Sequence, residues 1–144
     1  MKLEELLMFI ENTLDKLYIE DRYLFQYNAR EEAIVARFYY LLRTKFELNG
    51  YRYDIDNEYN CDKFAENGRK GIIFDDKEKC IIPDLIIHKR GSNEDNLAVI
   101  EFKKTSNKKK KDRDWDETKL KFLTRNSLRY KYKYGFLLTS IVID

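Results

Sequence analysis

The sequence predicts a single α/β domain in which a mixed four-stranded sheet is flanked by helices. Three observations carry this prediction. Two early segments repeat apolar residues at helical spacing, the middle of the chain holds short apolar runs separated by turn residues, and a last apolar run follows one further helical segment. The expected order is therefore helix, helix, strand, strand, strand, helix, strand.

Composition excludes several classes of protein. The 144 residues suffice for one domain with its own core, and a content of 43% hydrophobic and 15% aromatic residues argues against disorder. Two cysteines and one histidine do not follow zinc-ligand spacing. No apolar run could span a membrane and no signal peptide is evident, so we expect a soluble, cytoplasmic protein with no membrane partner. The net charge of +2 means that any nucleic-acid signal must be local.

The first helix is expected over residues 3–18, and residues 1–20 form an accessory element within the single domain 1–144. Leu3, Leu6, Leu7, Ile10 and Leu14 recur at helical spacing, with charged residues opposite. No polar residue interrupts this apolar face, so we assign it no chemistry. We expect it to cover the domain or to pack on a protein partner.

The second helix is expected over residues 28–45, with Asn28 as a plausible N-cap. Glu31 and Glu32 lie in its first turns, where the helix dipole favours acids. Glu31 lies one turn before the apolar Ile34 and so falls on the core-facing stripe, whereas Glu32 lies off it. Glu31 is therefore either a helix-start acid or an acid turned toward a site.

Residues 51–60 read as the first strand, and residues 61–79 as a polar loop with a small hairpin around the apolar run GIIF. The next strands are expected over residues 80–88 and 97–103, joined by a turn rich in Gly, Ser, Asn and Asp. Cys80 opens the first of them and is expected to be a buried thiol. His88 ends the same strand and is interpreted as a surface residue.

Charged residues stand inside these two apolar strands. If the strands form an antiparallel hairpin, the turn places Asp84 opposite Glu101, and Glu101 shares its face of the sheet with Lys103. Two neighbouring carboxylates repel each other, and a small cation relieves the repulsion; oxygen ligands suit Mg²⁺ or Mn²⁺. The alternative is a solvated sheet face, which is common in a chain with 38% charged residues.

Residues 103–113 form the densest basic run and are expected to be a loop, which either is merely solvated or contacts phosphates. A third helix is expected over residues 114–130. After it, basic residues alternate with Tyr130, Tyr132 and Tyr134, which either stack on bases or simply pack. Residues 134–143 form the last strand, expected to be buried and parallel to its neighbour.

The residues of the central hairpin resemble a known family. Pro83–Asp84 followed by Glu101, Phe102 and Lys103 is similar to the signature of the PD-(D/E)XK nuclease superfamily. The resemblance runs from Asn28 to the C-terminus. It implies a restriction endonuclease-like αβββαβ core, a divalent metal bound by Asp84, Glu101 and the Phe102 carbonyl, and catalytic assistance from Lys103.

Two further segments resemble a subgroup of small, uncharacterised bacterial and phage members. The stretch NAREEAIVARFYYLL resembles the subgroup's first helix, and aligning Arg37 selects Glu31 as a further catalytic and metal-binding acid. The stretch DETKLKFLT resembles the helix after the catalytic strand, which makes Lys119 a lysine that faces the site. The expected nucleic-acid contacts are Lys104, Lys108, Lys109, Lys110, Lys111, Arg113 and Lys119.

The sequence and the resemblance together predict Mg²⁺- or Mn²⁺-dependent hydrolysis of phosphodiester bonds in nucleic acid, with DNA as the expected substrate. A homodimer is compatible with this activity. Two alternatives stay open: a catalytically silent module that binds nucleic acid, and a module that binds protein through its first helix.

Overall fold

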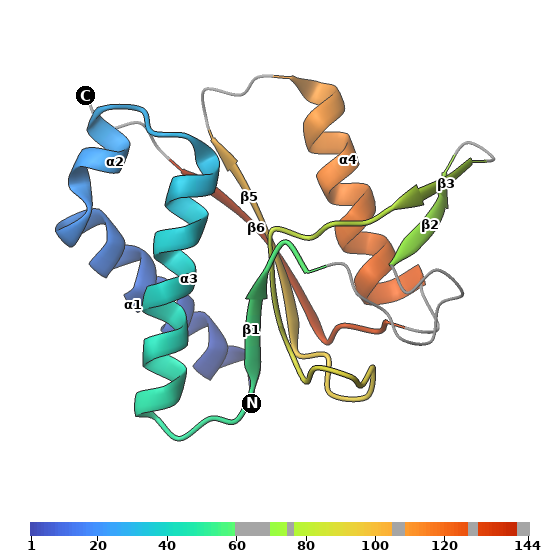
Figure 1. The fold of residues 1–144 in the computed structure, drawn as a ribbon, viewed down its shortest axis with the longest axis horizontal. Helices are drawn as coiled ribbons and strands as arrows, with labels where there is room; N and C mark the ends of the chain where they lie inside the picture. Colours follow the sequence, from blue (N-terminus) through green and yellow to red (C-terminus); the bar gives the residue numbers. More distant parts are fainter. Residues whose placement is uncertain (60–69, 75–76, 105–108, 127–129, 141–144) are drawn as a thin grey trace.

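The structure is a computed structural model, which describes residues 1–59, 70–74, 77–104, 109–126 and 130–140 (Figure 1). The predicted order of elements is confirmed, with additions. The helices are α1 (Leu3–Glu20), α2 (Arg22–Gln26), α3 (Glu31–Leu48) and α4 (Lys110–Lys121), which continues into a π-helical turn, η1 (Phe122–Asn126). The strands are β1 (Asp54–Asn57), β2 (Gly71–Phe74), β3 (Lys77–Cys80), β4 (Leu85–His88), β5 (Ala98–Lys104) and β6 (Tyr134–Ser140).

A mixed four-stranded sheet forms the centre of the fold, as predicted. Its strand order is β1-β4-β5-β6, with β1 and β5 antiparallel to β4 and with β6 parallel to β5. Strands β2 and β3 pair as a separate hairpin, which confirms the small hairpin expected around GIIF. The last strand is parallel as expected, but it lies at the end of the sheet and its side chains are half-buried or exposed rather than fully buried.

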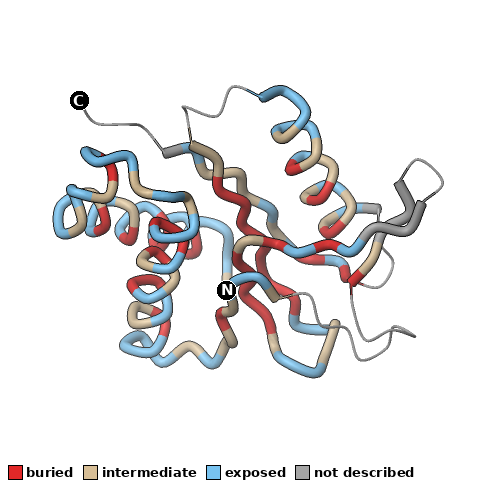
Figure 2. The backbone as a smooth tube through the Cα atoms, turned by 45° about the horizontal axis from the view of Figure 1, so that its top comes forward, coloured by how far each residue is buried: buried red, intermediate tan, exposed pale blue. Residues whose placement is uncertain are grey.

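Helices cover both faces of the sheet. Helices α1 and α3 lie on one face and α4 lies on the other (Figure 1). Because successive residues of a strand point to opposite faces, β4 and β5 contribute to two cores. Leu85, Ile87 and Ile100 pack against α1 and α3, whereas Ile86 and Val99 pack with Leu123 on the α4 side. Figure 2 shows the resulting band of buried residues along the sheet.

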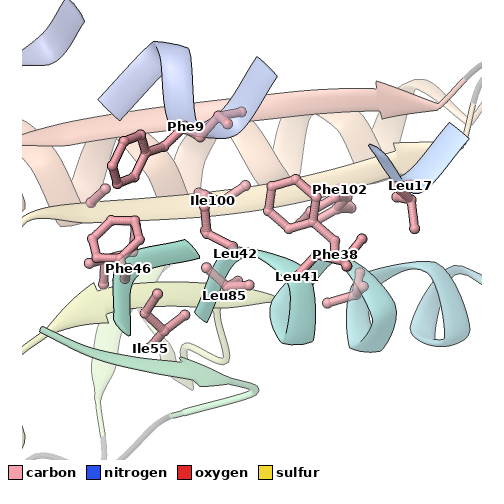
Figure 3. Close-up of a cluster of buried hydrophobic side chains, with 14 of the residues drawn as sticks. Phe9, Leu17, Phe38, Leu41, Leu42, Phe46, Ile55, Leu85, Ile100 and Phe102 are labelled. Carbon is pink, nitrogen blue, oxygen red and sulfur yellow. The ribbon is translucent and has the colours of Figure 1, made fainter. Parts of the chain in front are cut away.

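The larger core lies between the sheet and the paired helices α1 and α3 (Figure 3). Phe38 is fully buried and meets the ring of Phe102 edge-on, with ring centroids 5.0 Å apart. Phe9 and Phe46 make a similar edge contact between the two helices at 5.4 Å. Each such ring removes a large apolar area from water, so this core fixes α3 against β5.

Helix boundaries differ from the predicted ones for local reasons. Helix α3 begins at Glu31 after Arg30, with no side-chain cap, while Asn28 adopts a positive φ of 50°. Asn28 is therefore a turn residue and not the N-cap. Helix α4 begins at Lys110, so the second half of the basic run is helical rather than a loop. The short helix α2 has too few residues to show an apolar repeat in the sequence.

Two further sequence expectations are wrong. Cys80 is exposed because it ends the outer hairpin strand β3 and does not begin the central strand. His88 is 2% exposed and lies 2.9 Å from Asp56 through Nε2, so it is a buried residue and not a surface one. Among the described residues, no helix has both the length and the apolar character needed to cross a bilayer.

Candidate active site

The pairing of β4 with β5 brings Asp84 and Glu101 together. Leu85 is opposite Ile100, so the next pair outward in the same register is Asp84 and Glu101, as the hairpin geometry predicted. The Oδ2 atom of Asp84 accepts a hydrogen bond of 2.8 Å from the backbone N–H of Phe102. Since the N–H and C=O of one strand residue point to the same side, the Phe102 carbonyl is also directed toward Asp84.

Helix α4 closes this face of the sheet with a second pair of charged side chains. Asp116 and Lys119 stand three residues apart on α4, so they lie on one face of the helix. The Lys119 ammonium lies 3.0 Å from Glu101 Oε2 and 3.2 Å from Asp116 Oδ1. The Lys103 ammonium lies 2.8 Å from Asp116 Oδ2. The side chains of Glu101, Lys119, Asp116 and Lys103 thus form a continuous chain of close carboxyl–ammonium contacts, which we call the charged chain.

Burial changes the protonation state of Glu101 within this charged chain. Glu101 is 0% exposed, and burial raises its pKa to about 9, with repulsion from Asp84 adding to the rise and Lys119 opposing it. Its Oε1 atom is buried and receives no hydrogen bond from a described residue. A carboxyl group in this setting holds its proton at neutral pH unless another cation neutralises it.

The two lysines of the charged chain favour their charged form, whereas Glu101 favours its neutral form. Burial alone would lower the pKa of each ammonium, but the surrounding carboxylates outweigh burial and raise it. Asp116 acts on both lysines, Glu101 on Lys119 and Glu31 on Lys103. Both lysines therefore carry a positive charge at neutral pH.

Glu31 lies near Asp84 and Lys103 but comes from α3, on the face of the sheet opposite α4. It is the first residue of α3, and its Oε2 atom accepts a hydrogen bond of 3.2 Å from the backbone N–H of Lys104. Partial burial raises the pKa of Glu31, Lys103 opposes the rise, and the nearby Asp84 adds to it. Glu32 points to solvent and pairs with Arg30, so Glu31 is the acid that faces inward, as the apolar stripe of the helix predicted.

The charges of this cluster do not balance. Glu31, Asp84, Glu101 and Asp116 supply four carboxyl groups, while Lys103 and Lys119 supply two ammonium groups. If all six ionised, two negative charges would be left over, which matches one divalent cation of the oxygen-binding class. Within the described part of the chain, however, no three His, Cys, Asp or Glu side chains are already gathered closely enough to hold a metal ion.

The residues predicted to contact nucleic acid fall into three groups. Lys109, Lys110, Lys111 and Arg113 are exposed around the first turn of α4, beside the end of β5. The Lys104 ammonium donates to the carbonyl and to Oδ1 of Asn28, at 3.3 and 3.2 Å. Lys119 is buried inside the charged chain, and Lys108 lies outside the described residues. Tyr130 and Tyr132, which alternate with basic residues before β6, are buried in the smaller core. These two rings therefore pack inside the protein and are not placed to stack on bases.

Sequence reasoning missed Asp116 as a site residue, because an acid near a helix start has an ordinary explanation. The available signal was its spacing of three from Lys119, which puts both on one helix face. It also missed a second polar cluster, in which Asp56 binds the buried His88 and the exposed Arg90 guanidinium. Burial lowers the pKa of His88 although Asp56 opposes the shift.

Comparison of the chain with models of known families, with curated proteins and with solved structures finds no match.

Proposed function

We propose that the protein is a metal-dependent nuclease of the PD-(D/E)XK type that hydrolyses phosphodiester bonds in nucleic acid. The observation that carries this proposal is the register of β4 and β5, which sets Asp84 beside Glu101. The Lys103 ammonium joins this pair through Asp116 and Lys119. The order of α3, β1, β4, β5, α4 and β6 agrees with the αβββαβ core that the sequence resemblance implies, with β2 and β3 as an insertion.

The residues fit a hard divalent cation in their chemistry. Asp84, Glu101 and the Phe102 carbonyl would hold Mg²⁺ or Mn²⁺, and Glu31 would complete the set of oxygen donors. Such an ion, when bound, supplies a Lewis acid that polarises the phosphodiester and lowers the pKa of water. Glu101 must give up its proton to act as a ligand, so its ionisation accompanies loading of the site.

The role of Lys103 follows from its charge. Its raised pKa keeps the ammonium protonated at neutral pH, so it would stabilise negative charge that develops on the phosphate rather than accept a proton. Asp116 holds the ammonium at 2.8 Å and so restricts where it can point. Asp116 is therefore a positioning residue in this proposal, and Lys119 plays the same part for Glu101.

The exposed cations at the start of α4 would hold the phosphate backbone of the substrate beside the carboxylates. Contacts of this kind give affinity without sequence selection, and they weaken as salt rises. We propose DNA as the substrate. Parallel assays on duplex DNA, single-stranded DNA and RNA of one sequence would decide this point.

The proposal is tested by cleavage of a labelled duplex with Mg²⁺ or Mn²⁺ in four variants. Asp84→Asn, Glu101→Gln and Lys103→Met should each reduce the rate by at least about a hundredfold, as is usual for groups in contact with the reacting atoms. Glu117→Gln changes an exposed acid on the same helix as Asp116 and should leave the rate unchanged. Wild-type rates in all three site variants would refute the nuclease proposal.

A catalytically silent nucleic-acid-binding module is the second candidate. The observation in its favour is that both site lysines are already paired with carboxylates, so the charged chain is partly neutralised without a metal. This alternative predicts nucleic-acid binding that falls steeply with salt, with no cleavage in either metal. It also predicts that Glu101→Gln leaves nucleic-acid affinity unchanged.

A further inference from the structure

A groove of about 480 Å³ runs along the first half of β6, at the outer edge of the sheet. Leu3 and Leu7 of α1 form one wall. The opposite wall comes from the end of α4 and from η1, and carries Lys121 and Arg125. Lys133 immediately precedes β6. The groove is therefore apolar on one side and basic on the other.

The floor of this groove is a strand edge. β6 is the last strand of the four-stranded sheet, and no other described strand lies beyond it. The backbone N–H of Tyr134 donates to the carbonyl of Leu97, the residue before β5, at 3.0 Å, so the backbone groups of Tyr134 point inward. Because successive residues direct their backbone groups to opposite edges, the N–H and C=O of Gly135 and Leu137 point outward. Such groups can pair with one added strand.

The charge of the groove defines the chemistry of an occupant. Of the described residues that line it, three are basic and none is acidic. An added strand alternates its side chains between the two walls, so acids at every second position would face Lys121 and Arg125. The positions between them would face Leu3 and Leu7, which are 38% and 36% exposed, and would be apolar.

We propose that this groove binds an extended segment of a partner protein, in which acidic and apolar residues alternate, as an added strand on β6. A nucleic-acid strand would leave the aliphatic wall of α1 without a matching surface. Pairing of β6 with the β6 of a second copy is disfavoured because β6 has no acidic residue to offer the basic wall. The groove proposal does not depend on the nuclease proposal.

The test uses a fluorescein-labelled peptide of about eight residues that alternates Val with Glu, measured by fluorescence anisotropy against the full chain. Two control peptides are needed: one alternates Val with Lys, and one has the same Val and Glu content in two blocks. We expect binding of the alternating acidic peptide only. Its addition should shift the amide signals of Gly135 and Leu137 in a nitrogen–proton correlation spectrum, a measurement that needs no variant.

Matched charge reversals locate the site. The triple variant Lys121→Glu, Arg125→Glu, Lys133→Glu should weaken peptide binding about tenfold or more. The triple variant Lys109→Glu, Lys110→Glu, Lys111→Glu carries the same change in charge beside the candidate active site and should bind the peptide as the wild type does. Glutamine replacements at the same three groove positions serve if the reversals disturb the fold.

Several outcomes would overturn the groove proposal. These are equal loss of peptide binding in both triple variants, amide shifts remote from β6, equal binding of the block peptide, or binding of a single-stranded oligonucleotide that only the groove variant loses. Self-association that the groove variant abolishes would instead assign the groove to a second copy. None of these results touches the cleavage assays, so failure of one proposal is distinguishable from failure of the other.

Discussion

Glu101→Gln should change how the stability of the metal-free protein depends on pH. The Glu101 carboxyl is fully buried beside Asp84, and its pKa rises from an ordinary value of 4.5 to about 9 on folding. The folded state thus binds this proton more tightly than the unfolded state does. The resulting stabilisation is complete below pH 4.5 and is lost progressively as the pH rises toward 9.

The size of this change in stability follows from the pH interval between the two pKa values of Glu101, 4.5 and about 9. Each pH unit inside it costs about 1.4 kcal/mol of unfolding free energy, so the step from pH 5 to pH 7 costs about 3 kcal/mol. Gln has nearly the same shape as protonated Glu and does not titrate. Titrations of groups far from Glu101 are the same in both proteins and cancel, so the difference between wild type and variant reports Glu101 together with its neighbours Asp84 and Lys119.

The assay is urea denaturation of both proteins in a chelator at pH 5, 6, 7 and 8. We expect the variant to gain stability relative to the wild type by about 3 kcal/mol between pH 5 and pH 7. Glu117→Gln, an exposed acid on α4, serves as the control and should run parallel to the wild type. A constant difference between wild type and Glu101→Gln across the series would show that Glu101 is ionised in the folded protein, which would refute the reasoning.

Three further results are expected. Phe38→Ala should lower the unfolding free energy by about 3–5 kcal/mol in urea denaturation, because it empties the fully buried contact with Phe102; a loss below about 1 kcal/mol would contradict the packing described. Replacing the three lysines at 109–111 by Ala should reduce the slope of log affinity for duplex DNA against log salt by about 2–3, measured by anisotropy; an unchanged slope would remove them from the interface. Asp116→Asn should shift the alkaline limb of the cleavage pH profile to lower pH, because Asp116 raises the pKa of Lys103; an unshifted limb with a uniformly reduced rate would mark a merely structural role.

The central hairpin could be predicted because its constraints are local. Side-chain alternation fixes which residues share a face, and the position of the turn fixes the register, so Asp84 and Glu101 could be paired from the sequence alone. The choice of Glu31 over Glu32 rests on the same kind of local periodicity in α3. Parallel pairing of β6 followed from the helical crossover before it.

Features that depend on tertiary contacts were not predictable in this way. The burial of His88 is stabilised by Asp56, and that contact joins residues far apart in the sequence. Asp116 belongs to the charged chain only because α4 packs over β5. The first residues of α4 are charged and lack an apolar repeat, so the sequence pattern did not predict that they are helical.

Calorimetric titration with Mn²⁺, of the wild type and of Asp84→Asn, tests the proposed cation site directly. We expect saturable binding in the wild type near neutral pH and loss of this binding in the variant. Binding should release a proton, which buffers of different ionisation enthalpy reveal. Equal binding heats in the two proteins, or none in the wild type, would contradict a divalent-cation site built on Asp84 and Glu101.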